Sequence, residues 1–138
     1  MLKNIVKSLL LSVVLFTMAC ANSVEYSFMV PQTDVRVKIL PDKLSHYKDG
    51  YERGVVKGDF GKIKYFKNIT LLPFVVSNQG SGVFYYIAVF EKKKHKKSFF
   101  IGDRIVIEEI DFKDDMISVR FKTRDAKKSE KKFTLDVK

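Results

Sequence analysis

The sequence predicts a mainly β protein, folded as an antiparallel β-sandwich or half-barrel of about eight short strands. Three observations predict this class. Apolar and polar residues alternate along many short segments, which is typical of half-buried strands. Turn-forming residues recur about every eight to twelve positions. After residue 19, no segment repeats apolar residues at helical spacing for more than about two turns, so little helix is expected.

The first expected strand is Val35 to Ile39, in which apolar residues alternate with basic ones. Pro41-Asp42 ends this strand, and residues 44–48 are expected to form one helical turn before the turn dipeptide Asp49-Gly50. A second extended segment covers residues 51–56. Glycines and charged residues then mark another reversal of the chain.

Two longer segments, 69–77 and 83–90, are apolar on both faces. This pattern is typical of strands that are covered on both sides, and we expect 83–90 to be the central strand. Pro73 lies inside the first segment and can donate no hydrogen bond to a neighbouring strand. It therefore predicts an edge position, a bulge or two shorter strands. The clearest loop of the chain, 78–82, separates the two segments.

The last third of the chain predicts three more strands, each with apolar residues on one face, at 105–107, 117–121 and 133–137. Before them, the lysine-rich residues 92–97 are expected to form a solvated hairpin tip. Asp114-Asp115 and residues 124–132 are expected to form the connecting turns. No internal repeat or linker indicates a second domain.

The first nineteen residues have the layout of a secretory signal peptide. Lys3 and Lys7 form a positive segment, residues 9–16 are apolar, and small residues follow. The apolar run is shorter than the roughly 20 residues needed to cross a bilayer, and a buried N-terminal strand or helix is the alternative interpretation. We therefore predict export, and divide the chain into a signal peptide (1–19), a lipid-anchored tether (20–27) and a single β domain (28–138).

Cys20 is the only cysteine of the chain, so it has no partner for an intramolecular disulfide. Ala19-Cys20 resembles the end of a bacterial lipoprotein signal peptide, although Thr17 and Met18 depart from the usual residues. The resemblance implies cleavage before Cys20 and a lipid on its sulfur. Because Ala21 rather than Asp follows, it also implies the outer membrane. The alternative is cleavage after Ala21, which would release a soluble protein.

Residues 80–90 (GSGVFYYIAVF) and 99–110 (FFIGDRIVIEEI) together resemble a family of small exported bacterial proteins. The resemblance covers about residues 55–138 and implies export and a single fold rather than a particular chemistry. Many members carry a calcium-like, Asp-rich segment before the first motif. Here the matching residues 58–64 contain one carboxylate and two lysines, whereas Ca²⁺ requires about six to eight oxygen ligands, so no calcium site is expected.

Five residues of these two motifs are expected to be structural. Gly80 and Gly82 permit positive φ angles at the entry to the central strand. Gly102, Asp103 and Arg104 are expected to form a capped turn in which both charges are satisfied locally.

No catalytic, metal-binding or cofactor-binding site is expected. Cys20 is used by the signal peptide, His95 is expected to be exposed among lysines that disfavour its protonated form, and His46 lies in a predicted turn. Glu108-Glu109 are strand neighbours that point to opposite faces, and Asp114-Asp115 suit a turn better than a pair of catalytic carboxylates. We therefore predict that the protein is not an enzyme.

The net charge of +10 has two interpretations. The first is contact with an anionic partner of the cell envelope, such as lipid headgroups, lipopolysaccharide phosphates or peptidoglycan carboxylates. The second is solubility, because charged hairpin tips prevent strand edges from pairing between molecules. No nucleic-acid recognition motif is present. The candidate residues for an anionic partner are Lys92, Lys93, Lys94, Lys96, Lys97, Lys127 and Lys128.

These observations together favour a lipid-anchored outer-membrane protein, facing the periplasm or the cell surface. We expect a non-catalytic binding or scaffold module, for example an accessory subunit of a secretion or envelope-assembly system. The alternative is a soluble secreted inhibitor or ligand-binding protein, released after Ala21.

Overall fold

The computed structural model describes residues 25–40, 45–46, 54–78 and 82–135. They form eleven β-strands and one short 3-10 turn, which confirms the mainly β, antiparallel fold class, with more strands than the expected eight. In chain order these elements are β1 (Tyr26–Met29), β2 (Arg36–Ile39), β3 (Ser45–His46), β4 (Gly54–Gly58), η1 (Phe60–Lys62), β5 (Lys64–Phe66), β6 (Ile69–Asn78), β7 (Gly82–Glu91), β8 (Lys94–Asp103), β9 (Val106–Lys113), β10 (Met116–Lys122) and β11 (Lys128–Thr134).

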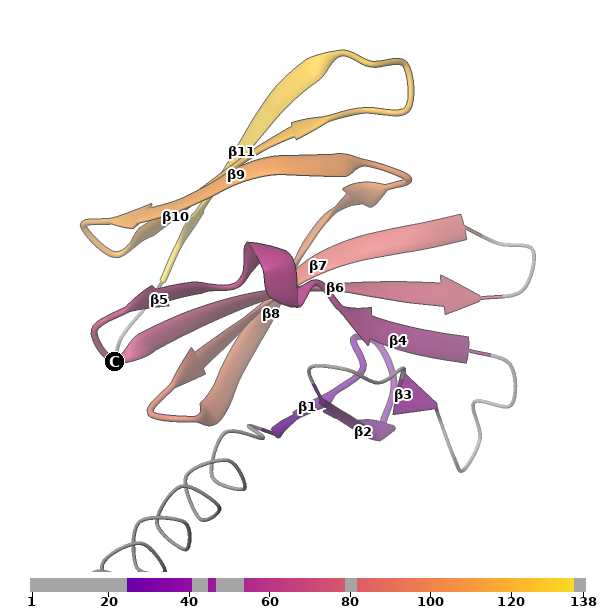
Figure 1. The fold of residues 1–138 in the computed structure, drawn as a ribbon, viewed down its shortest axis with the longest axis vertical. Coiled ribbons are helices and arrows are strands. Elements are labelled where there is room, and N and C mark those ends of the chain that lie inside the picture. Colours follow the sequence, from indigo (N-terminus) through magenta and orange to yellow (C-terminus); the bar gives the residue numbers. More distant parts are fainter. Residues whose placement is uncertain (1–24, 41–44, 47–53, 79–81, 136–138) are drawn as a thin grey trace, which may run out of the picture.

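The strands form three antiparallel sheets that stack as layers (Figure 1). The central sheet has six strands, in the order β3-β4-β6-β7-β8, with β5 as a second neighbour of β6. The β1–β2 hairpin covers one face of this sheet, and the three-stranded sheet β11-β10-β9 covers the other. Each covering layer encloses its own apolar core.

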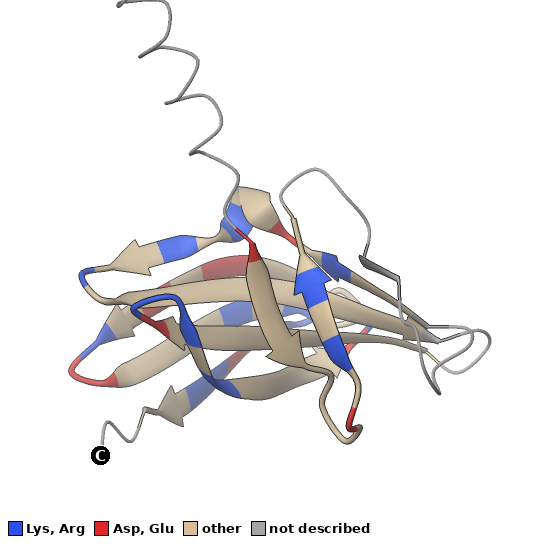
Figure 2. Ribbon diagram, turned by 90° about the horizontal axis from the view of Figure 1, so that it is seen from below, with Lys and Arg blue, Asp and Glu red and all other residues tan. Residues whose placement is uncertain are grey.

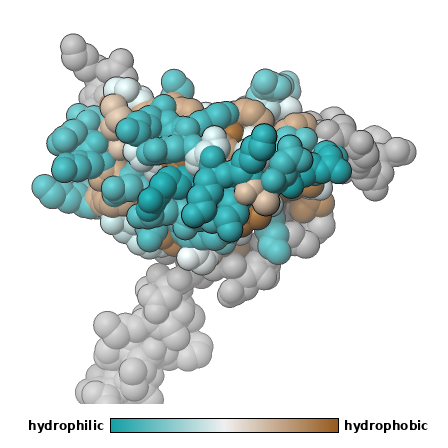
Figure 3. Space-filling view, turned by 90° about the horizontal axis from the view of Figure 1, so that it is seen from above, coloured by the Kyte–Doolittle hydropathy of each residue, from teal (hydrophilic) through white to brown (hydrophobic). Residues whose placement is uncertain are grey.

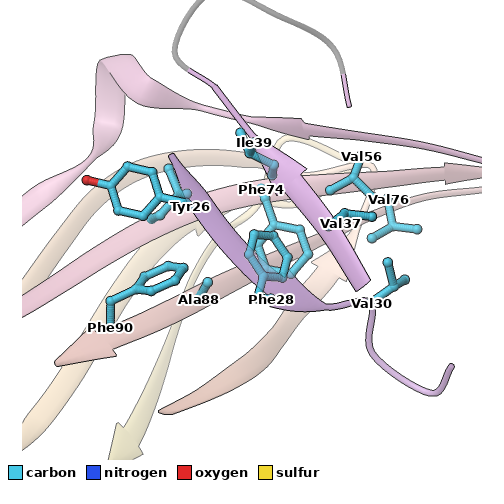
Figure 4. Close-up of a cluster of buried hydrophobic side chains, with 11 residues drawn as sticks. Tyr26, Phe28, Val30, Val37, Ile39, Val56, Phe74, Val76, Ala88 and Phe90 are labelled. Carbon is cyan, nitrogen blue, oxygen red and sulfur yellow. The ribbon is translucent and has the colours of Figure 1, made fainter. Parts of the chain in front are cut away.

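The core beneath the β1–β2 hairpin is rich in aromatic rings (Figure 4). Phe28 of β1 is fully buried, with its ring centroid 4.6 Å from that of Phe74 and 6.0 Å from that of Phe90. The second core, on the opposite face of the central sheet, is mostly aliphatic. Its fully buried members include Leu71, Ile87 and Ile117.

The central strands β6 and β7 are apolar on both faces because both faces are covered. Along β7, Ala88 and Phe90 belong to the hairpin-side core, whereas Ile87 and Val89 belong to the opposite core. This strand pairs with β6 on one side and β8 on the other, so it is an interior strand, although β6 rather than β7 lies in the middle of the sheet.

Pro73 lies within a continuous β6, at the point where its neighbouring strand is interrupted. On that side, β4 pairs with β6 as far as Phe74 and β5 begins pairing at Leu71. The carbonyl of Pro73 accepts a hydrogen bond from the Asp59 amide, 2.7 Å away. Because the nitrogen and carbonyl of a strand residue point to the same side, the donor that proline lacks faces the gap between β4 and β5. β6 is therefore one continuous strand. The break that Pro73 predicts lies in the neighbouring position, which is shared by the two shorter strands β4 and β5.

Two details of the first half differ from expectation. β1 begins at Tyr26, two residues before the expected start of the β domain, and Tyr26 is buried although it lies in the predicted tether. The helical turn predicted over 44–48 is also absent from its described residues, since Ser45–His46 pair with β4 as β3. In both places, a segment too short to show a period adopts a strand through pairing with a distant neighbour.

Candidate functional site

Two lysine-bearing hairpin turns lie side by side at one end of the molecule. Lys67-Asn68 connect β5 to β6, and Lys92-Lys93 connect β7 to β8. The backbone amide of Lys92 donates a hydrogen bond to the carbonyl of Asn68, 3.0 Å away, which joins the two turns. We call Lys67, Asn68, Lys92 and Lys93 the basic turn pair. Figure 2 shows blue hairpin turns at this end, at the left of the view.

All three lysines of the basic turn pair have left-handed backbone conformations. Their φ angles are 48° for Lys67, 50° for Lys92 and 69° for Lys93. Lys92-Lys93 form a two-residue loop of the type that normally contains Asn and Gly, because both positions require a positive φ. A residue with a Cβ costs roughly 1–2 kcal/mol at such a position. The chain therefore places lysines at turn positions where the backbone favours other residues.

The structure divides the lysine cluster predicted at 92–97. The hairpin tip consists of Lys92 and Lys93 alone, whereas Lys94, Lys96 and Lys97 belong to β8, the edge strand of the central sheet. Lys96 pairs with Glu91 at 3.7 Å, and the Lys97 ammonium lies 5.0 Å from the centre of a β8 aromatic ring. Lysines and register shifts on an edge strand prevent its pairing with another chain. The positions of Lys94, Lys96 and Lys97 are consistent with this protective role.

An acidic turn lies beside the basic turn pair. Asp114-Asp115 connect β9 to β10, as expected, and both residues have positive φ angles. Between this turn and Lys67 is an open hollow of about 490 Å³. Phe66 and Phe112, whose ring centroids are 5.6 Å apart, contribute to its wall. This end of the molecule thus has a basic side and an acidic side.

Lys127 and Lys128 lie at the opposite end of β10, far from the basic turn pair. The acidic turn directly precedes β10, and Lys128 pairs with Lys122 at the other end of this strand. The seven residues of β10 span about 20 Å. Lys128 belongs to the outer face of the three-stranded sheet, where basic and acidic side chains alternate. Arg120 pairs with Glu109 there. Figure 3 shows this face as mostly hydrophilic, which is typical of a solvated surface.

The start of β7 contacts the end of β8 through Gly82, Gly102, Asp103 and Arg104. Gly82 has a φ of +131°, and the Asp103 carboxylate accepts a hydrogen bond from the Val83 amide at 2.9 Å. The Arg104 amide donates to the Val83 carbonyl at 2.8 Å, and its guanidinium lies 3.5 Å from the Asp103 carboxylate. The two hydrogen bonds reach across to the neighbouring strand, whereas the ion pair between Asp103 and Arg104 is local, as expected. Gly80 lies outside the described residues.

His95 is half-buried, in contrast to the exposed position expected from its lysine neighbours. Its ring lies 5.5 Å from that of Phe28 and 5.4 Å from that of Phe90, and its Nε2 shares a hydrogen bond with the Ser98 hydroxyl at 2.9 Å. The pKa of His95 is lowered, mainly by burial. A backbone hydrogen bond at Lys97 raises this pKa, and the charge of Arg36 lowers it. The histidine packs as part of the core.

We expect the free energy of unfolding to fall as the pH drops from about 7 to about 5, partly because of His95. Its folded pKa lies below the ordinary value of 6.5, so the unfolded chain takes up the proton first and is favoured by acid. Denaturant titrations of the unaltered protein and of His95→Gln measure this contribution, because glutamine can still bond to Ser98. Equal pH slopes in the two proteins would contradict the expectation.

A tyrosine pair that the sequence does not single out lies beside the basic turn pair. Tyr65 in β5 is 67% exposed, between Lys64 and the turn at Lys67. Its hydroxyl shares a hydrogen bond with Tyr26 of β1, and burial together with this bond raises the pKa of Tyr26. No pattern in the sequence relates these two residues, because their contact depends on how the β1–β2 hairpin docks.

Within the described part of the chain, no group of three or more His, Cys, Asp or Glu side chains is arranged to hold a metal ion. The same part contains no helix long and apolar enough to cross a membrane. Cys20 and the side chain of His46 lie outside the description. Comparisons with protein-family models, curated proteins and solved structures find no match to this chain.

Proposed function

We propose that the protein is a lipid-anchored protein of the bacterial outer membrane, which acts as a non-catalytic binding or scaffold module. The signal-peptide layout and the single cysteine, Cys20, support the anchor. In this proposal, the β domain presents a surface to an anionic component of the envelope. An accessory subunit of a secretion or envelope-assembly system is one form that such a module would take.

The basic turn pair is the observation that carries the binding role. The hydrogen bond between the Lys92 amide and the Asn68 carbonyl joins two turns that are distant in the sequence. It brings Lys67, Lys92 and Lys93 to one end of the molecule, and this local concentration of positive charge supports contact with an anionic partner. The mixed charges around Lys128, in contrast, favour a solvated surface there.

The position of His95 supports a non-catalytic role. Its ring is packed between two phenylalanines, and its Nε2 is already bonded to Ser98. A general base requires access to the proton that it removes, which this packing restricts. The carboxylates at Asp114-Asp115 form a hairpin turn, in agreement with a structural role for them.

Replacing Cys20 with serine is expected to abolish incorporation of labelled palmitate and to prevent normal maturation, because the serine hydroxyl cannot replace the sulfur that receives the lipid. Labelling of growing cells, followed by separation of membrane and soluble fractions, measures both effects. Ser12→Ala, in the same apolar segment, is the matched control and should be labelled and processed normally.

Normal maturation and membrane fractionation of Cys20→Ser would contradict the lipid anchor. If the unaltered protein takes up no palmitate and is recovered in the soluble fraction, the soluble alternative cut after Ala21 replaces the proposal.

A further inference from the structure

The chain enters the β domain at the end that carries the basic turn pair. Tyr26, the first residue of β1, has its ring centroid 5.0 Å from that of Phe90, which precedes Lys92 by two residues. Its hydroxyl shares a hydrogen bond with Tyr65, which precedes Lys67 by two residues. Both turns of the pair therefore lie close to the point where the chain enters the fold.

Covalent geometry limits how far a lipid on Cys20 can lie from this point. Tyr26 is six positions after Cys20, and a fully extended chain covers at most about 3.3–3.6 Å per residue. A lipidated Cys20 therefore lies no more than about 22 Å from Tyr26. This short reach holds the entry end of the domain next to the bilayer that contains the lipid.

The surface at this end has the composition of a membrane-interface surface. Tyr65 is 67% exposed and is flanked by Lys64 and Lys67. Tyrosine rings are enriched at the level of lipid headgroups, and lysines near an anionic leaflet are attracted to it. The sequence separates Lys67 from Lys92 and Lys93, but the bond between the two turns brings their charges together.

The acidic side chains near this end have other partners or belong to the layer on the other face of the central sheet. Glu91 pairs with Lys96, and Glu25 pairs with Lys38 at 3.4 Å. Asp114 and Asp115 belong to the layer on the other face of the central sheet, opposite the face where Tyr26 is buried. The acidic turn shares a hollow with Lys67, whereas Tyr65 lies on the face where the chain enters.

We propose that Tyr65 and the basic turn pair rest on the anionic phospholipid headgroups of the bilayer in which the Cys20 lipid is inserted. This inference rests on the proposed lipid anchor and specifies what the lysines contact. Docking in this way orients the domain, with the β10–β11 turn and Lys127 directed away from the bilayer. The anchor and the lysines then act as two signals that hold the domain against one surface.

The test uses the full-length, lipid-modified protein reconstituted into vesicles of phosphatidylethanolamine and phosphatidylglycerol. The vesicles contain a lipid with a spin label on its headgroup, which quenches nearby fluorophores. A fluorophore is attached to a new cysteine in the turn pair, Asn68→Cys, or in the opposite turn, Asp125→Cys. We expect strong quenching of the fluorophore at position 68 and little at position 125.

The charge variant is Lys67→Asn, Lys92→Asn and Lys93→Gly, made in the Asn68→Cys protein. It removes three charges and places residues that favour a positive φ at all three positions, so its fold is preserved or stabilised. With three lysines removed, the equilibrium between docked and undocked domains should shift by about 100-fold, with loss of quenching at position 68. The matched control removes three charges from the opposite turn, in Arg124→Ser, Lys127→Ser and Lys128→Ser, and should keep the quenching.

Each of three outcomes would overturn a different part of this proposal. Equal quenching at positions 68 and 125 in the anchored protein would overturn the orientation and leave the anchor intact. Absence of palmitate on the unaltered protein would overturn the anchor itself. If position 68 is not quenched while the same three lysines are needed for sedimentation with peptidoglycan sacculi, the partner is peptidoglycan and the lipid contact is overturned.

Discussion

Replacing Phe28 with alanine is expected to lower the free energy of unfolding by about 3–5 kcal/mol. Phe28 is 0% exposed, and its ring packs against Phe74, Phe90 and His95. The cost is large because the β1–β2 hairpin forms a sheet of its own in the described structure. Its attachment to the central sheet therefore depends on side-chain packing, and Phe28 lies at the middle of that packing.

Phe100→Ala is the matched control for this loss of a ring. Phe100 is 44% exposed, with the Lys131 ammonium 5.3 Å from the ring centre, so its truncation should cost only about 1 kcal/mol. Urea denaturation followed by circular dichroism measures both variants. The packing interpretation is wrong if Phe28→Ala costs no more than Phe100→Ala.

Replacing Gly82 with alanine is expected to cost about 2–3 kcal/mol. Its φ of +131° is strained for any residue with a Cβ, and a Cβ built there would lie 3.0 Å from a carboxylate oxygen of Asp103 and 3.1 Å from the ring of Phe84. Moving that carboxylate would also weaken its hydrogen bond to the Val83 amide. The substitution therefore disturbs the junction between β7 and β8 as well as the backbone of one residue.

Gly61→Ala is the control for the general effect of replacing glycine. The nearest atom to a Cβ at Gly61 is 3.6 Å away, which is ordinary contact, so alanine should be neutral or slightly stabilising. Thermal unfolding of both variants distinguishes the two positions. A similar change in melting temperature for Gly82→Ala and Gly61→Ala would show that the positive φ of Gly82 carries no special cost.

A strand that is buried on both faces could be predicted from the sequence, because it appears there as an unbroken run of apolar residues. Residues 83–90 are apolar throughout, and the structure places them in an interior strand with a core on each side. Asp114-Asp115 were also recognisable, since turn residues between two alternating segments predict a hairpin. Each of these predictions depends on residues that are neighbours in the chain.

Pro73 illustrates a prediction that the sequence could only narrow. A missing donor predicts an edge, a bulge or a broken strand, and all three satisfy the same local chemistry. The choice depended on β4 and β5, which approach β6 from elsewhere in the chain and leave the gap at Pro73. β1 was missed for a related reason, because four residues are too few to show a strand period, although Tyr26 is buried by packing.

The sequence by itself determined the class of fold, because a period of two along short segments is a property of neighbouring residues. It also predicts the exported state and the lipid anchor at Cys20 from a local pattern. Only the tertiary structure decided which charges share a surface. Lys67 and Lys92 meet because a backbone hydrogen bond joins two hairpin turns, and Tyr26 meets Tyr65 because a hairpin docks on a sheet. Such contacts depend on how separate strands pair and pack, and no local pattern records them.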